Sequence, residues 1–162
     1  MQYKNIFDIN FNWKSITLLA LLAFLPDLTG MINLPTVWGF KIHFFQYFVF
    51  VAAAVYGPVG GLISGGFGSV FTVVTMNNPH ILIGNMILGF FTGWFFRKGI
   101  NLVLAALIAY AIQMPWLWLT DVYLANMPIN VVNGVVIALF FSDVIWALFA
   151  HYSYKKVRNV VE

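Results

Sequence analysis

The sequence predicts an all-α integral membrane protein, a compact bundle of six transmembrane helices that forms a single domain over residues 1–162. The chain is 62% hydrophobic and 8% charged, with a mean hydropathy of +0.89, whereas soluble domains are about half apolar and a quarter charged. Its apolar stretches are also interrupted at intervals close to the roughly 20 residues that a helix needs to cross a bilayer. Both observations place the chain in a membrane.

Each predicted break between helices contains residues that end helices. Proline lacks the N–H that continues a helix, and glycine favours turns. The breaks are Pro35 with Gly39, Gly57-Pro58, Asn77-Asn78-Pro79, Arg97-Lys98-Gly99, and the stretch from Thr120 to Pro128. The helices are therefore expected at 15–33, 40–56, 59–76, 80–97, 100–119 and 128–153. Connections this short make neighbouring helices mostly antiparallel.

The first helix begins like a secretory signal, because the apolar run 16–25 follows Lys4 and Lys14. A signal would end in small residues that permit cleavage, whereas Pro26-Asp27-Leu28 follows here. We therefore expect this segment to be retained as a helix.

Basic residues predict which end of the bundle faces the cytoplasm. With six spans, the two termini and the link between the fourth and fifth helices share one side. That side carries Lys4, Lys14, Arg97, Lys98, Lys155, Lys156 and Arg158. Lys41 alone lies opposite. Both termini are therefore predicted to be cytoplasmic, and the connections near 34–42, 76–80 and 120–128 are predicted to be external.

The external connections and the helix ends beside them are rich in polar and aromatic residues. Small-molecule pockets are mostly apolar, with a few directional polar groups. We therefore expect a substrate-binding site there. Its candidate residues are Lys41, His43, Asn77, Asn78, His80, Asn85, Trp116, Trp118, Asp121 and Tyr123. The alternative is that the aromatic residues form an interfacial belt and the asparagines cap helices.

Different ligand groups would suit different members of this set. Lys41 could meet an anionic group and Asp121 a cation or a ring N–H, while Trp116, Trp118 and Tyr123 could stack on a planar ring. Plainer roles are also open, because lysine can extend to lipid headgroups and aspartate can cap a helix.

Two acidic residues lie inside predicted spans, where ionisable groups are costly and are functional candidates. Asp27 lies about 13 residues after Lys14, roughly 20 Å along a helix, and is expected near the floor of the external pocket. Asp143 lies past the middle of the last helix. It could pair with a basic residue of this chain, face a partner subunit or remain neutral.

Small residues recur every four positions in the segment YGPVGGLISGGFG, residues 56–68, and again in the fourth helix. The repeated glycines are Gly57, Gly61, Gly65, Gly89 and Gly93. This spacing lets helices approach closely in lipid, so we expect these glycines to pack helices together. A phosphate-binding loop is disfavoured, because no GxxxxGK[ST] is present.

Catalytic and metal-binding patterns are missing from the sequence. The chain has no cysteine, no HExxH and no GxSxG, and its histidines are spread over both predicted faces. A net charge of +3 is too small and scattered for a nucleic-acid surface. We therefore expect neither an enzyme nor a cofactor or metal held by this chain.

Two segments joined by a short polar link resemble the substrate-binding membrane subunits (S components) of energy-coupling factor (ECF) transporters. They are YGPVGGLISGGFGSVF and PHILIGNMILGFFTGWFFRKG. In that family a "fGP..G...G" turn opens the third helix and a "G...G.f.rk" pattern closes the fourth. The similarity in hydropathy extends over nearly the whole chain.

The resemblance implies a subunit that captures a vitamin, a vitamin precursor or a transition-metal ion from outside a prokaryotic cell. It would sit in the cytoplasmic membrane with a membrane coupling subunit and two subunits that hydrolyse ATP. Metal-transporting members begin with a Met-His stretch, whereas this chain begins MQYKNIF, so an organic nutrient is expected. A self-contained carrier, proton-coupled in one version, and a membrane sensor or assembly protein are the alternatives.

The family also contacts its coupling subunit through small residues of the first helix, often spaced AxxxA. The corresponding candidates here are Ala20 and Ala23, which are three positions apart rather than four. Ordinary helix packing is the alternative role for them.

Overall fold

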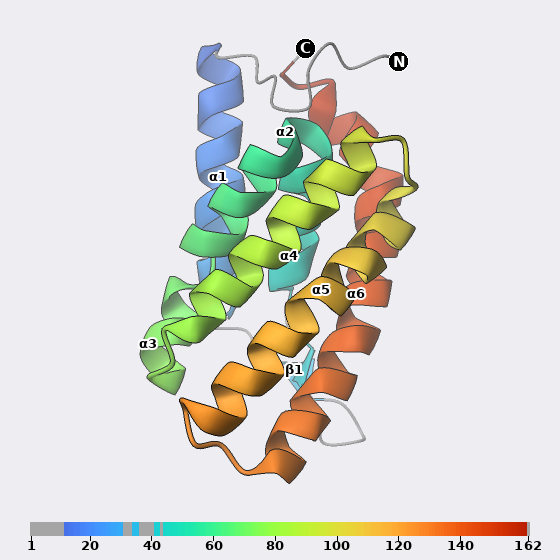
Figure 1. Ribbon diagram of the computed structural model, residues 1–162. Coiled ribbons are helices and arrows are strands. Elements are labelled where there is room, and N and C mark those ends of the chain that lie inside the picture. Colours follow the sequence, from blue (N-terminus) through green and yellow to red (C-terminus); the bar gives the residue numbers. More distant parts are fainter. Residues whose placement is uncertain (1–11, 31–33, 36–40, 43, 162) are drawn as a thin grey trace.

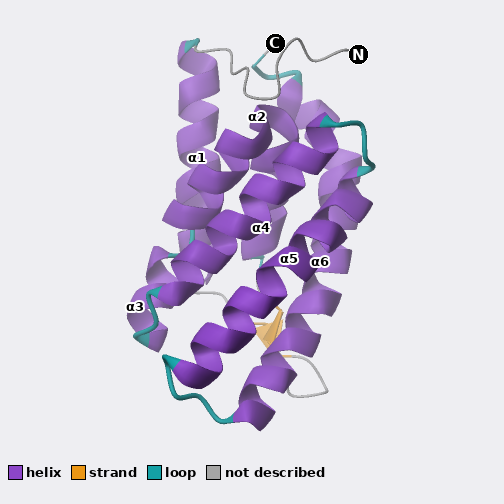
Figure 2. Cartoon of the chain, in the orientation of Figure 1, coloured by secondary structure: helices purple, strands orange, loops and turns teal. Residues whose placement is uncertain are grey.

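The computed structural model describes residues 12–30, 34–35, 41–42 and 44–161. The helices are α1 (Trp13–Gly30), α2 (Phe45–Phe67), α3 (Val70–Met76), α4 (His80–Arg97), α5 (Leu102–Tyr123) and α6 (Ile129–Arg158). A short antiparallel pair, β1 (Leu34–Pro35) and β2 (Lys41–Ile42), lies between α1 and α2 along the chain. Figures 1 and 2 show the long helices side by side in one bundle. The predicted all-helical class is confirmed.

Helix α2 consists of two arms that meet at Gly57. This residue has φ 71° and ψ −155°, whereas the helix continues on both sides of it. A positive φ is readily adopted by glycine alone. Pro58 then opens the second arm, where its missing N–H has no intrahelical acceptor to lose. The first arm, 45–56, and the second arm, 58–67, together with α3, correspond to the predicted helices 40–56 and 59–76.

The chain reverses direction between these two arms. The last turn of the first arm lies beside the end of α4, where Arg97 Nη2 donates a hydrogen bond to the carbonyl of Val55 at 3.3 Å. The second arm then runs back along α4, from the contact of Gly57 with Gly93 to the contact of Gly65 with Asn85. The second arm and α4 are therefore antiparallel neighbours.

Glycines allow the second arm and α4 to touch through their backbones. A Cβ atom on Gly61 would overlap the carbonyl oxygen of Gly89, and one on Gly89 would overlap that of Gly61. A Cβ on Gly65 would likewise overlap the carbonyl oxygen of Asn85. The two repeats of small residues thus lie face to face, in the most extensive helix contact of the bundle.

Among the described residues, three helical stretches are long and apolar enough to cross a membrane by length and composition: Phe45–Met76, Leu102–Tyr123 and Ile129–Arg158. The first is largely enclosed by other helices, whereas α6 exposes large apolar side chains such as Phe141 and Phe149. Exposed side chains of this kind are costly in water and suit a lipid surrounding.

The prediction for the start of α2 was wrong. The helix was expected from residue 40 but begins at Phe45, because Lys41 and Ile42 pair with Pro35 and Leu34 instead. The predicted helix 59–76 is also interrupted between Phe67 and Val70. Hydropathy alone distinguishes neither the strand pair nor the short break from continuous helix.

Other helix ends also differ from the prediction. Helix α1 occupies Trp13–Gly30 rather than 15–33, and residues 31–33 lie outside the described part of the chain. Helix α5 continues to Tyr123, so Thr120 and Asp121 lie in its last turns rather than in a connection. Helix α6 continues to Arg158 instead of 153 and ends in basic residues, which interact favourably with a helix C-terminus.

The bundle has two chemically different ends (Figure 1). The start of α1, the link between α4 and α5 and the end of α6 lie at one end, where Asn12 Nδ2 donates to the carbonyl of Val161 at 3.1 Å. We call this the basic end. Its cationic residues in the described part of the chain are Lys14, Arg97, Lys98, Lys155, Lys156 and Arg158. The links from α3 to α4 and from α5 to α6 lie at the opposite end, together with β1 and β2.

Replacing Gly61 with leucine should destabilise the protein, because the new side chain would force the second arm and α4 apart. The cost is expected to be about 3 kcal/mol, which would lower the thermal midpoint in detergent by about 6–12 °C. Ala111→Leu, at an exposed position of α5, is the matched control and should unfold at the parent temperature. Equal midpoints for both variants would contradict the role of the backbone contact.

Candidate functional site

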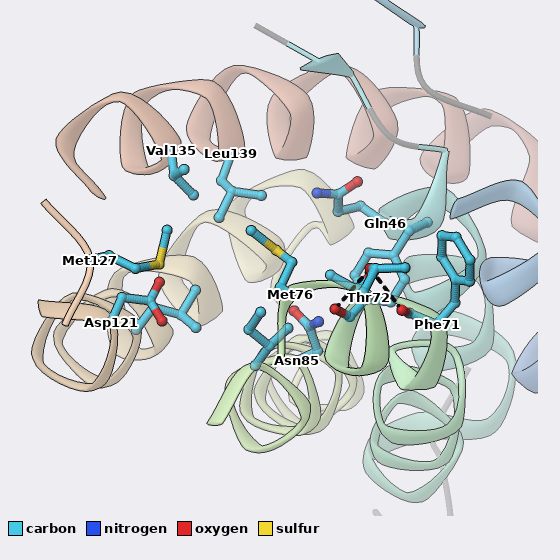
Figure 3. A pocket seen from close by; sticks show the side chains of 13 residues that line it. Gln46, Phe71, Thr72, Met76, Asn85, Asp121, Met127, Val135 and Leu139 are labelled. Carbon is cyan, nitrogen blue, oxygen red and sulfur yellow. Dashed lines mark hydrogen bonds between the residues drawn. The ribbon is translucent and has the colours of Figure 1, made fainter. Parts of the chain in front are cut away.

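A cavity of about 420 Å³ lies near the end of the bundle opposite the basic end. It lies between the first arm of α2 and helices α3, α4, α5 and α6 (Figure 3). Most of its lining is apolar. The described lining residues are Phe45, Gln46, Phe71, Thr72, Thr75, Met76, Ile81, Asn85, Leu117, Asp121, Met127, Val135 and Leu139. This size and composition are typical of small-molecule pockets.

Asp121 provides a carboxylate on the cavity wall and is almost fully buried. Its Oδ1 accepts a hydrogen bond of 2.6 Å from the side-chain amide of buried Asn78, and the Asn78 side-chain oxygen accepts the backbone N–H of His80 at 3.1 Å. The backbone carbonyl of Asp121 accepts the N–H of Met127 at 2.9 Å. The links from α3 to α4 and from α5 to α6 are thereby joined at this residue.

Asn85 provides an amide whose orientation is fixed on both sides. Its Nδ2 donates to Ser69 Oγ at 2.9 Å, and its Oδ1 accepts a bond of 3.1 Å from Nε2 of buried Gln113. Ser69 Oγ in turn donates to the carbonyl of Gly65. This network connects α4 to α5 and to the junction between α2 and α3, so the Asn85 amide is held by two other parts of the bundle.

Gln46, in the first turn of α2, is the third strongly polar group of the lining. The side chain is buried, and its Oε1 accepts a hydrogen bond of 3.3 Å from Ser142 Oγ. The amide nitrogen is therefore the group that Gln46 can present to a ligand. In Figure 3, Gln46 and Asp121 lie at opposite sides of the cavity.

Of the predicted site residues, Asn85 and Asp121 line the cavity and Asn78 contacts Asp121. His80 and Trp116 lie next to this group: Trp116 Nε1 donates to the carbonyl of His80 at 3.1 Å, and the two ring centroids are 6.4 Å apart. Neither of these two residues is part of the lining.

The remaining predicted residues lie elsewhere. Trp118 donates to Asn133 at 3.1 Å and contacts Tyr123, which is 66% exposed. Asn77 is exposed and ends α3 in the left-handed conformation, with φ 49°. The backbone of Lys41 belongs to β2, whereas its side chain and the whole of His43 lie outside the described part of the chain.

Several lining residues were not included in the sequence-based site. Gln46 carried a usable signal, because it is an amide within an otherwise apolar and aromatic segment. Phe71, Thr72, Thr75 and Met76 carried none, because α3 has the composition of an ordinary membrane helix. Their role becomes visible only once the chain reverses at Gly57.

The predicted partner-binding alanines do not share one surface. Ala20 is exposed, whereas Ala23 is buried inside the bundle at 3% exposure. They therefore face different directions on α1.

The two acids within helices also differ. Asp27 accepts the backbone N–H of Phe71 at 2.9 Å. Asp143 is fully buried, and neither of its carboxylate oxygens has a hydrogen-bond partner among the described residues. It lies one turn beyond Leu139, which lines the cavity. No group of three or more residues able to hold a metal ion occurs in the described part of the chain.

Comparison with known proteins identifies the family. The model of the family described as "ECF-type riboflavin transporter, S component" matches residues 10–150. No curated protein and no solved structure matches the chain. The family match includes α1 to α5 and most of α6, and therefore every residue of the cavity lining. The chain therefore belongs to the ECF-type riboflavin transporter S components, which are multi-pass proteins of the prokaryotic plasma membrane that capture a transport substrate and are not enzymes.

Proposed function

We propose that this chain captures riboflavin, or a closely related flavin, from outside the cell for ATP-driven uptake. A membrane coupling subunit and two ATPase subunits would complete the transporter. The observation that carries the proposal is the cavity itself, since a protein of the riboflavin S-component family has a small-molecule pocket near the end of the bundle opposite the basic end.

The chemistry of the cavity suits a flavin. A flavin has a flat, largely apolar ring system with carbonyls and an N–H along one edge, and a side chain of hydroxyl groups. Phe45, Phe71 and Leu117 offer apolar surface for the ring. Gln46 can donate to a carbonyl, and Asp121 can accept an N–H or a hydroxyl. The volume of about 420 Å³ falls within the ~300–1,000 Å³ range of such pockets.

The proposed orientation follows from the charge on the two ends. Lysine and arginine accumulate on the cytoplasmic side of membrane proteins, and the cationic residues at the start of α1, at the link from α4 to α5 and at the end of α6 lie together at the basic end. We therefore infer that both termini are cytoplasmic and that the cavity is external. Six crossings would be made by α1, the two arms of α2, α4, α5 and α6.

Asp121→Asn should weaken riboflavin binding by about tenfold. The replacement keeps an oxygen to accept from Asn78 but removes the charged acceptor from the cavity, and a hydrogen bond to a charged group contributes about 1.5–3 kcal/mol. Quenching of riboflavin fluorescence by the purified protein measures the change. Asn133→Ala, which removes an exposed amide outside the cavity, is the control. Unchanged affinity in Asp121→Asn would exclude Asp121 from the binding site.

Uptake of riboflavin into vesicles should need ATP and all partner subunits. Vesicles that contain this chain with the coupling subunit and active ATPase subunits should accumulate riboflavin, and those with inactivated ATPase subunits should only bind it. Uptake by this chain alone would indicate a self-contained carrier. Binding without uptake in the complete assembly would indicate a sensor.

The natural absence of cysteine allows a direct test of orientation. Leu124→Cys, at an exposed position after α5, should react with a membrane-impermeant maleimide in intact cells. Asn159→Cys, at an exposed position after α6, should react only after the membrane is permeabilised. The reverse labelling pattern would place the cavity on the cytoplasmic side and contradict capture from outside.

A further inference from the structure

Helix α3 forms one wall of the cavity but is itself weakly packed. It contributes four of the thirteen described lining residues: Phe71, Thr72, Thr75 and Met76. The helix is only seven residues long, and none of its side chains is fully buried. Helices this short have marginal stability by themselves, so contacts with other elements must determine the position of α3.

Two adjacent residues of α1 hold the point where α3 begins. Asp27 accepts the backbone N–H of Phe71 at 2.9 Å. This N–H belongs to the first turn of α3 and lacks an acceptor within the helix, and a carboxylate at a helix N-terminus is favourable. Pro26 is fully buried beside Gly68, where a Cβ would come within 2.5 Å of the proline Cβ. Two side chains of α1 therefore contact the junction of α2 and α3: Asp27 at the backbone of Phe71 and Pro26 at Gly68.

A further contact reaches this junction from α4, and a separate one joins α1 to the second arm of α2. Asn85 of α4 donates to Ser69, and Ser64 Oγ of the second arm donates to the carbonyl of Leu22 in α1 at 2.6 Å. The Ser64 contact ties α1 to the bundle without involving α3. Among the described residues, Asp27 is the side chain of α1 that hydrogen-bonds to α3.

We infer that Asp27 is a positioning residue for ligand binding. Its carboxylate fixes the position of Phe71 and the rest of α3 at the cavity wall, and this position determines the dissociation rate of a bound ligand. The same bond links α1, the helix in which we predict the contact with the coupling subunit, to the cavity wall. A displacement of α1 would therefore move α3. The kinetic part of this inference rests on the proposed flavin-binding function, because the dissociation rate is measured with riboflavin.

The test compares Asp27→Ala, Asp27→Asn and Ser64→Ala with the parent chain, all as purified full-length protein in detergent. The first readout is the rate of riboflavin dissociation, measured by fluorescence after dilution or displacement. The second is hydrogen exchange of the amides in residues 70–76, measured by mass spectrometry without ligand. Ser64→Ala is the matched control, because it removes a hydrogen bond between α1 and the bundle that does not reach α3.

Asp27→Ala should raise the dissociation rate about tenfold, the factor that corresponds to loss of one hydrogen bond to a charged acceptor. Association should change much less. Asp27→Asn keeps a weaker, neutral acceptor and should raise the rate about threefold. Exchange in 70–76 should accelerate in the same order. Ser64→Ala should leave both quantities at their parent values, even if it lowers the thermal midpoint.

The inference would be overturned if the amides of residues 70–76 exchanged at the parent rate in the Asp27 variants. It would also be overturned if Ser64→Ala accelerated their exchange equally. If Asp27→Ala fails to fold, Asp27→Asn decides in the same way, because its side chain has the same shape as that of aspartate. If riboflavin does not bind the parent protein, the proposed function fails, and hydrogen exchange without ligand still decides whether Asp27 holds α3.

Discussion

The structure depends on the backbone contact between Gly61 in the second arm of α2 and Gly89 in α4. Helices in lipid gain little from the hydrophobic effect and associate mainly through packing. With a Cβ on either glycine the two helices could not approach this closely. The contact fixes the position of α4, and α4 in turn carries Asn85 and Ile81 to the cavity. Recognition at one end of the bundle thus depends on the absence of side chains near its middle.

Residues spaced four apart along α4 serve helix packing at one end of the row and the cavity wall at the other. Gly93 and Gly89 contact the second arm, and Asn85, one turn nearer the cavity, contacts Gly65 through its backbone while its side chain joins Ser69 and Gln113. The helices remain as close here as at Gly89, and a side chain fits at position 85 because Gly65 opposite has none and the Asn85 amide is directed to Ser69 and Gln113. The polar wall is therefore an extension of the close helix contact, which explains how a single repeat can serve both purposes.

Composition and spacing predicted the features that depend on local sequence. The helical class, the break at Gly57 and the family resemblance carried by the glycine segment are confirmed. Features that depend on long-range pairing were not predictable. The strand pair that delays the start of α2 involves residues on both sides of a connection, and the role of α3 as a cavity wall depends on the reversal at Gly57. Asp121 was selected for its charge, but its hydrogen bond to Asn78 is visible only in the three-dimensional structure.

Most polar groups of the cavity are already paired before a ligand arrives. Asn85 is bonded at both ends of its amide, Asp121 at one carboxylate oxygen and Gln46 at its carbonyl oxygen. In surroundings with little water an unpaired polar group is expensive, so this pairing stabilises the empty pocket and holds each side chain in place. The cost of ordering these groups is then met on folding rather than on binding. Only the atoms still free, such as the Gln46 amide nitrogen, remain for a ligand, and these few atoms decide which molecule the pocket accepts.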